Sequence, residues 1–274
     1  MPKRPSSMRH LDNALRRAFG GTVDGYMRMR TLVANAIVAQ MLPDGVVKGG
    51  SALRIRFGSD ASRYTTDLDI ATASDPDEYA AELSKSLAAG WEGFSGRVVR
   101  REPAVPAGVP DEYVMRPFDV KLSYLGRPWC TVPLEVGFDE IGDADQADVI
   151  RQAEASEALE ALGFPALGDA ALMDLCYQVA QKLHGLTGSP NRVRDLVDLQ
   201  LIAGKTDIDL ARTRRICMRL FAYRHAQPWP PKVVAGKNWS EIYAAQAEGL
   251  EALQNLDEAV EWANDFIARI DAAR

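Results

Sequence analysis

Four consecutive residues, Lys48-Gly49-Gly50-Ser51, have the composition of a phosphate-binding turn. Glycine lets the backbone approach an anion closely and take positive φ, and consecutive N–H groups in such a turn form an anion-binding nest. The residues after Ser51 are typical of a helical turn that opens at the serine, so a phosphate would also face a helix N-terminus. The sequence therefore predicts that Gly50 and Ser51 bind a nucleotide phosphate, with Lys48 beside them.

Two aspartates, Asp67 and Asp69, follow in a short segment that reads as a strand. Side chains two residues apart on a strand point to the same face. Mg²⁺ in proteins is often held by one or two carboxylates together with waters and phosphate oxygens. The polar loop of residues 58–66 would bring Arg63 near these acids as a further nucleotide-binding group. The phosphate turn and the carboxylate pair together predict a site that holds a nucleoside triphosphate on Mg²⁺ and moves a nucleotidyl group.

A third carboxylate could complete this site, because activating a hydroxyl or holding a second metal needs another negative group. Glu135 alternates with apolar neighbours in a predicted strand, so we expect it to join Asp67 and Asp69 as a metal ligand. Asp119, in the preceding strand, is the alternative third carboxylate. We expect the two strands of the hairpin to be of opposite phase, so that Asp119 and Glu135 cannot both face the metal. Taken singly, each motif also fits an ordinary turn or an exposed strand face; their order favours a site.

A second charged group lies in the C-terminal half of the sequence. Lys182 falls on a predicted helix, and its ammonium is a compact charge suited to triphosphate oxygens. Asp195 and Asp198 are three residues apart on the next predicted helix and share a face. They could orient the lysine or an arginine, or contact the nucleotide ribose. The alternative is an internal salt bridge that joins two helices.

Composition limits the class of protein. The 274 residues carry a net charge of −6, which argues against a surface coated with positive charge for nonspecific nucleic-acid binding. We find no apolar run long enough to span a membrane and no signal-peptide core at the N-terminus, so we expect a cytoplasmic protein without a membrane partner. The three cysteines and three histidines are scattered, which favours reduced core thiols and argues against a histidine-based metal site.

The predicted elements form an α+β fold. Residues 8–42 show helical spacing, residues 75–90 read as a capped helix, and strands are expected at 46–47, 67–71, 97–100, 118–124 and 131–138. Helices are expected from 148 to 161, 168 to 186, 191 to 202, 209 to 225 and 239 to 270. We therefore predict two domains: a small mixed β-sheet core with an N-terminal helical cover over residues 1–145, and a mainly helical lobe over residues 146–274.

One predicted helix, residues 211–225, concentrates positive charge. Its basic residues are Arg212, Arg214, Arg215, Arg219, Arg224 and His225. Two interpretations stay open. Nearby acids could balance an exposed helix face, or the face could follow the backbone of an RNA, whose phosphates lysine and arginine neutralise.

Taken together, the motifs resemble those of the AbiEii-like nucleotidyltransferase toxins, including the MenT group. The resemblance spans about residues 45 to 202 and is carried by four segments in this order: Val47-Lys48-Gly49-Gly50-Ser51-Ala52-Leu53-Arg54, Thr66-Asp67-Leu68-Asp69-Ile70, Ala180-Gln181-Lys182-Leu183-His184 and Arg194-Asp195-Leu196-Val197-Asp198-Leu199. It implies a polymerase-beta-like nucleotidyltransferase core followed by a helical domain that closes over the nucleotide.

The resemblance also implies roles for individual residues. Gly50 and Ser51 would hold the triphosphate, Asp67 and Asp69 the Mg²⁺, and Lys182 the phosphates, while Asp195 or Asp198 would supply the remaining acid. Members of this family come from toxin–antitoxin or phage-defence operons and add nucleotides, often pyrimidines, to the 3′ end of tRNA, which blocks charging. The expected partners are therefore an NTP, an RNA such as tRNA, and an antitoxin protein. Transfer to a protein or small molecule, and a non-catalytic regulatory module, are the alternatives.

Overall fold

The structure, a computed structural model, describes residues 2–19, 21–103, 114–142 and 145–274. It divides into two compact units. The first contains Met1–Arg56, Tyr64–Asp139 and Ala147–Leu172, and the second contains Phe57–Arg63, Glu140–Gln146 and Met173–Arg274. The main change between these units falls between Leu172 and Met173, and the predicted domain boundary after residue 145 stays a prediction. Two short segments of the second unit also interrupt the sequence of the first.

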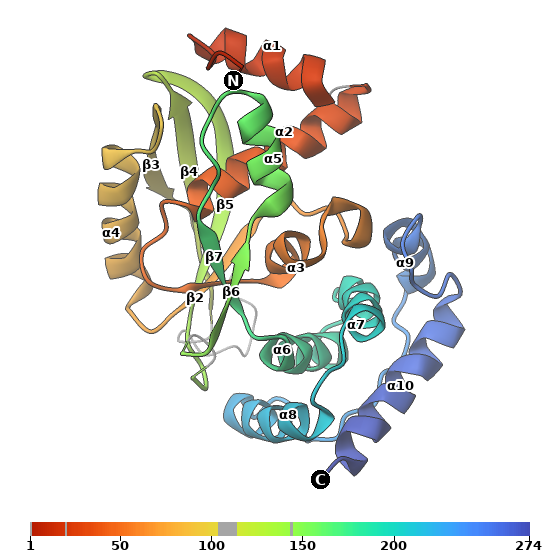
Figure 1. Cartoon of the computed structure of the whole chain (residues 1–274). Coiled ribbons are helices and arrows are strands. Elements are labelled where there is room, and N and C mark those ends of the chain that lie inside the picture. The colour runs from red at the N-terminus through yellow and green to blue at the C-terminus, as the bar shows by residue number, and fades with distance from the viewer. Residues whose placement is uncertain (1, 20, 104–113, 143–144) are drawn as a thin grey trace. The chain divides into compact units, whose positions relative to one another are not determined.

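A mixed sheet forms the centre of the first unit (Figure 1). Within the described residues it has seven strands in the order β3-β4-β5-β2-β1-β7-β6. β2 runs parallel to β5 and antiparallel to β1, β4 runs antiparallel to both β3 and β5, and β1 pairs in parallel with β7. The strands are β1 (Val46–Lys48), β2 (Leu68–Thr72), β3 (Phe94–Arg100), β4 (Arg116–Tyr124), β5 (Arg127–Phe138), β6 (Ala147–Arg151) and β7 (Asp169–Met173). The α+β class is confirmed.

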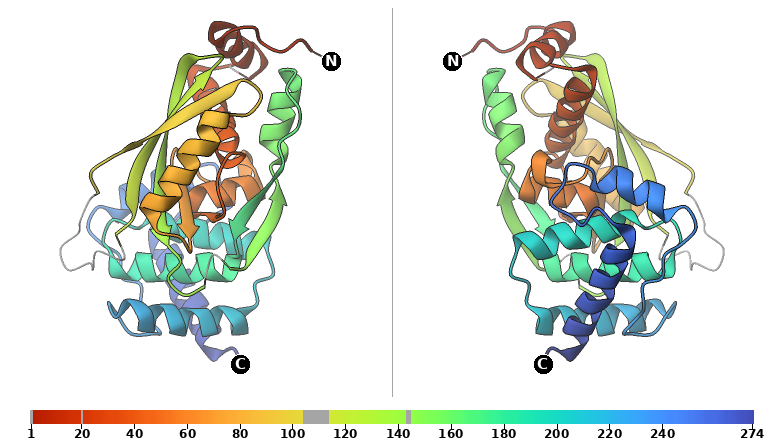
Figure 2. Two further views of the ribbon diagram at one scale, coloured as in Figure 1. Left: turned by 90° about the vertical axis from the view of Figure 1, so that its left-hand side faces the viewer. Right: turned by 90° about the vertical axis from the view of Figure 1, so that its right-hand side faces the viewer.

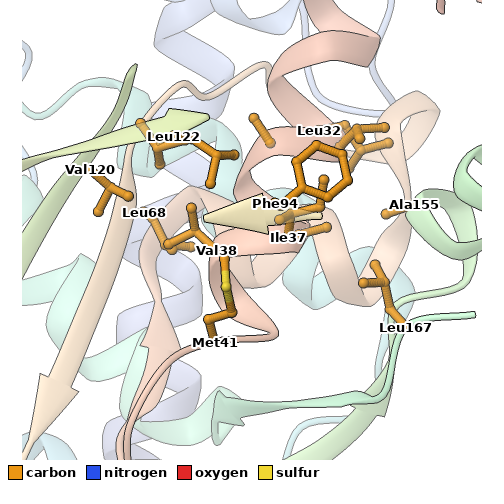
Figure 3. Close-up of a cluster of buried hydrophobic side chains, with 14 of the residues drawn as sticks. Leu32, Ile37, Val38, Met41, Leu68, Phe94, Val120, Leu122, Ala155 and Leu167 are labelled. Atoms are coloured by element: carbon orange, nitrogen blue, oxygen red, sulfur yellow. The ribbon is translucent and has the colours of Figure 1, made fainter. Parts of the chain in front are cut away.

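One face of this sheet carries the hydrophobic core of the first unit. Alternate residues of β2, β4 and β5 are apolar and fully buried, among them Leu68, Val120 and Leu134. They pack against Leu32, Ile37 and Val38 of α2 and against α4, and Figure 3 shows part of this cluster. The helices of this unit are α1 (Met8–Phe19), α2 (Val23–Ala39), α3 (Gly49–Phe57), α4 (Pro76–Ala89) and α5 (Ala153–Ala161). The opposite face of β1, β2 and β5 carries Lys48, Asp69 and Glu135 beside the buried Val46 and Ala71.

The sequence signals for helix ends work as expected in α4. The Asp75 side chain accepts hydrogen bonds from the N–H groups of Asp77 and Glu78, and Pro76 occupies the first helical position. Gly90 ends the helix with φ of 76°. The predicted capped helix of residues 75–90 is therefore confirmed. Residues 8–42, which show helical spacing, form the two helices α1 and α2.

For two of the helices expected after residue 145, the prediction is wrong in the first residues, which form strands instead. Residues 147–151 form strand β6 before α5 begins at Ala153, and residues 169–173 form strand β7 before α6 (Leu175–Gly188). The segment of β7 reads Asp-Ala-Ala-Leu-Met, which has good helix formers. Pairing of Leu172 with Val47 of β1 overrides that propensity, because both side chains are buried in the sheet.

The second unit is built from packed helices. α6 contacts both α7 (Arg194–Lys205) and α8 (Leu210–Arg224), and α10 (Leu256–Ala272) contacts α7, α8 and α9 (Trp239–Ala247). Figure 2 shows α6 and α8 side by side within this unit. A short 3₁₀ turn, η1 (Ser59–Ala61), also belongs to it. Among the helices of the described residues, none combines the length and apolar character that a membrane span requires.

Candidate active site

Gly49, Gly50 and Ser51 form the first turn of helix α3 and not a loop before it. The helix therefore begins two residues earlier than expected. Gly49 has φ of 67°, a conformation that favours glycine. A Cβ added there would lie 2.0 Å from Oδ2 of Asp69. The Asp69 carboxylate therefore rests directly on the backbone at the start of the helix, and only glycine leaves room for it.

This contact predicts a strong effect for Gly49→Ala. The methyl group would displace the Asp69 carboxylate, so we expect nucleotidyl transfer to fall by about a hundredfold or more while the sheet stays folded. Gly126→Ala is a matched control, because Gly126 has a similar φ of 71° but nothing within 4 Å of the added Cβ. Initial rates and circular dichroism of both variants check this. Equal losses in the two would mean that backbone strain, and not Asp69, causes the effect.

Ser51 connects α3 to the start of β2. Its side chain is buried, and its hydroxyl donates a hydrogen bond to the backbone carbonyl of Asp67. Thr66 Oγ1, at the end of the polar loop, donates to Oδ1 of Asp67 at 2.8 Å. A Cβ on Gly50 would lie 3.2 Å from Cβ of Thr65, so the same loop packs closely on the glycine. Phosphate binding by Gly50 and Ser51 stays a prediction.

Three charged residues form a row across the polar face of the sheet. Lys48 of β1 is the register partner of Asp69 in β2, and Asp69 is the parallel register partner of Glu135 in β5. All three side chains are half-buried. The Lys48 ammonium lies 3.4 Å from the point that a Cβ on Gly137 would occupy, so the lysine reaches over β2 toward β5. Sequence alternation alone placed Glu135 on this face, and the register agrees.

Asp119 shares that face, which corrects the expectation about the hairpin. Pro117 of β4 is the register partner of Glu135, and Asp119 lies two residues further along the same strand. Asp119 and Glu135 are therefore in phase. The Asp119 carboxylate forms an ion pair with Lys121, whose Nζ donates a hydrogen bond to it at 2.7 Å. Between the two candidates, the structure favours Glu135 as the acid nearest Asp69 in the sheet.

The three-carboxylate metal site is not preassembled. Over the residues that the structure describes, no three His, Cys, Asp or Glu side chains are grouped closely enough to hold a metal ion. Asp67 is exposed just before β2, and Asp69 is half-buried within it. A role for Glu135 as a third metal ligand therefore stays a prediction.

The second charged group forms a buried ion network within the helical unit. Lys182 of α6 donates to Oδ1 of Asp195 at 3.1 Å and to Oδ2 of Asp198 at 2.6 Å, both on α7. Arg63 approaches Asp198 with two parallel hydrogen bonds of 2.8 Å, from Nε and Nη2. Lys182, Asp195 and Asp198 are each no more than 5% exposed. We call Arg63, Lys182, Asp195 and Asp198 the buried quartet.

Charge balance holds the quartet together. Burial alone would raise the pKa of Asp198, but Lys182 and Arg63 outweigh burial and lower it to about 2. Burial likewise would lower the pKa of Lys182, but Asp198 and Asp195 raise it above its ordinary value. Lys182 and Asp198 are therefore both charged at neutral pH. Arg192 completes the arrangement by donating from Nε to Asp195 at 2.7 Å.

The quartet matches the salt-bridge alternative that the sequence left open, with one addition. Lys182 does join two helices through Asp195 and Asp198. The part played by Arg63, 135 residues away from Asp198 in sequence, gave no local signal. Its Nη1 also donates to Gln246 at 3.2 Å. Nucleotide binding by Arg63 and Lys182, and the choice between Asp195 and Asp198 as a catalytic acid, stay predictions.

Most arginines of the basic helix α8 have partners inside the helical unit, which favours the charge-balanced interpretation. Arg224 makes two hydrogen bonds with Glu140, and Arg212 pairs with Asp174 at 2.9 Å. Arg219 donates to the carbonyl of Ile141, and Arg214 lies 3.5 Å from Asp271. Most of these arginines therefore already have partners within the protein, which weakens the interpretation of α8 as a binding surface for an RNA backbone.

Comparison with known proteins decides the family. Residues 30–271 match the family described as nucleotidyl transferase AbiEii toxin, type IV toxin–antitoxin system. The chain belongs to the AbiEii nucleotidyl transferase toxin family. The matched range includes both the β1–α3–β2 segment and the buried quartet. No curated protein matches the sequence of this AbiEii-family chain.

One solved structure shares the fold of the AbiEii-family chain, and a second has a lower similarity. MenT4, a nucleotidyltransferase toxin from Mycobacterium tuberculosis H37Rv, superposes with a TM-score of 0.58 at 17% identity, over 96% of this chain and 90% of MenT4. JHP933 from Helicobacter pylori covers 89% of this chain and 91% of its own at 13% identity, with a TM-score of 0.44. The first likeness establishes a nucleotidyltransferase-toxin fold. The family implies a nucleotide substrate and an antitoxin partner.

Proposed function

We propose that this AbiEii-family chain transfers a nucleoside monophosphate from an NTP to the 3′ end of an RNA, the acceptor end of tRNA, and thereby blocks translation. The observation that carries the proposal is the placement of Asp69. Its carboxylate lies against the glycine that starts α3 and in register with Lys48 and Glu135. An acid, a lysine and a helix N-terminus are thereby concentrated where a metal-bound triphosphate can be held.

The carboxylates at this position fit Mg²⁺. Their oxygens are hard donors, and one or two carboxylates suffice for an ion that keeps waters and phosphate oxygens as its remaining ligands. Asp67 and Asp69 would hold it, with Glu135 as the candidate third ligand. When bound, Mg²⁺ neutralises phosphate charge and polarises the phosphoryl group for attack.

The chain's own residues act by positioning and charge. Gly49 leaves space for the Asp69 carboxylate, and the Ser51 hydroxyl fixes the backbone of Asp67. The N–H groups at the start of α3 face a phosphate, and Lys48 adds a positive charge on the same sheet face. The 3′-oxygen of the acceptor would bond to the α-phosphorus of the NTP, and the bond from that phosphorus to the bridging oxygen would break to release pyrophosphate. A carboxylate of the site or water would take the proton of the hydroxyl.

The acceptor is tested by offering the protein each α-labelled NTP in turn, with Mg²⁺ and three separate acceptor pools: total cellular RNA, total protein and a small-molecule extract. We expect label in RNA of tRNA size, from one NTP more than the others. A pyrimidine NTP is the family's expectation. Label in protein or in the small-molecule pool would instead support the alternative acceptors, and no label in any pool would favour a non-catalytic module.

A further inference from the structure

An exposed aromatic ring lies close to two arginines, three residues before Asp67. Tyr64 is 38% exposed. The guanidinium carbon of Arg28, on α2, lies 5.3 Å from the centre of its ring, and that of Arg54, on α3, lies 5.7 Å from it. All three residues belong to the first unit. Tyr64 therefore presents an electron-rich ring in a positively charged setting.

The ring is fixed in place by the elements around it. The Tyr64 hydroxyl and Thr31 Oγ1 on α2 form a hydrogen bond of 3.0 Å. Asn35 Nδ2, one turn further along α2, donates to the backbone carbonyl of Thr66 at 3.3 Å. The hydrogen bonds hold the loop against α2 on both sides of Thr65, so little freedom would be lost when a ligand stacks on the ring.

The chemistry of this cluster suits an unpaired nucleobase. Bases stack on aromatic rings and on arginine planes, and unpaired RNA bases are commonly recognised in this way. Arg28 is exposed, so its guanidinium can also neutralise a backbone phosphate. Buried Arg54 supports the ring from α3 and donates from Nη2 to the Arg28 carbonyl at 3.2 Å.

The position of the ring connects it to the reaction. Three residues of chain span at most about 11 Å, so Tyr64 lies within one or two nucleotides of Asp67. The triphosphate is expected at the start of α3, which already offers N–H groups and Lys48. The arginines beside Tyr64 form a second positively charged position with an aromatic ring. Such a position suits the second substrate, an RNA strand. Resting on the proposed function, we propose that Tyr64 and Arg28 form a stacking platform for the unpaired 3′-terminal bases of the acceptor RNA.

The test compares Tyr64→Ala, Tyr64→Phe and Arg28→Gln with the wild type. The substrates are an RNA hairpin with a three-nucleotide 3′ tail and the same hairpin without the tail. We expect Tyr64→Ala to raise the KM for the tailed hairpin about tenfold and to leave the KM for the NTP unchanged, because base stacking is lost. Tyr64→Phe keeps the ring and should stay within about twofold of the wild type. Arg28→Gln, a surface change, should raise the same KM and reduce its salt dependence.

Tyr223→Ala is the matched control, because Tyr223 is also 38% exposed but lies on α8 in the helical unit. It should leave both KM values unchanged. Unchanged KM values for RNA in Tyr64→Ala and Arg28→Gln would overturn the platform, as would a rise confined to the KM for the NTP. If the wild type transfers nothing to any RNA, the proposed function fails separately, and fluorescence anisotropy with the tailed hairpin still tests the platform by direct binding.

Discussion

Asp69→Asn should reduce nucleotidyl transfer by about a thousandfold while leaving the fold intact. The substitution keeps the size of the side chain but removes the charge that would hold Mg²⁺ and removes one acceptor oxygen. Asp69 is half-buried in the central strand β2 and lies against Gly49, so no other carboxylate can take its position without moving the backbone. Initial rates of label incorporation, with circular dichroism as the folding check, measure the effect.

Asp119→Asn tests whether activity depends on the negative charge of Asp69 itself or on negative charge anywhere on this face of the sheet. Asp119 lies on the same face but is paired with Lys121, so we expect most of the activity to remain. If the two variants lost activity equally, the face as a whole, and not the Asp69 position, would be responsible. An Asp69→Asn protein with wild-type rates would remove the basis of the proposed site.

Asp198→Asn should destabilise the protein by about 3–5 kcal/mol, because it leaves Lys182 and Arg63 buried with too little negative charge to balance them. Urea unfolding followed by circular dichroism measures this loss. Lys205→Met is the matched control. Lys205 also makes a 2.7 Å pair, with the exposed Glu251, and we expect no measurable change in the unfolding midpoint. A loss in Asp198→Asn no larger than in the control would contradict the structural role of the quartet.

The quartet also predicts a direction of pH dependence. Because the pKa of Asp198 is lowered to about 2 in the folded protein, its contribution to stability is fully present above the unfolded pKa of about 4. That contribution is lost as the pH falls from about 4 toward 2. The stability difference between the wild type and Asp198→Asn should therefore be largest near neutral pH and shrink in acid.

Local patterns predicted the motif-bearing elements well. Alternation in residues 67–71 and 131–138 was sufficient to find β2 and β5, because these strands have one buried apolar face and one polar face. Asp75, Pro76 and Gly90 marked both ends of α4 through capping chemistry that acts within a few residues. The order of the glycines, the acids and Lys182 was enough to indicate the family.

Long-range pairing accounts for what the sequence did not reveal. β7 is a strand because it pairs with β1, more than a hundred residues earlier, and its own residues favour a helix. The phase of Asp119 relative to Glu135 depends on the register of β4 against β5, in which Pro117 lies opposite Glu135. The partner of Arg63 lies in α7, so no local pattern could distinguish a nucleotide-binding arginine from one committed to Asp198.

The most direct test of the central claim uses total RNA before and after periodate oxidation, which destroys the 3′-terminal diol. Wild-type protein is incubated with Mg²⁺ and the preferred α-labelled NTP, and the RNA is then sized. Transfer to the RNA 3′ end predicts a labelled band of tRNA size with untreated RNA and no band with oxidised RNA. Equal labelling of oxidised RNA, or label found only in protein, would contradict it.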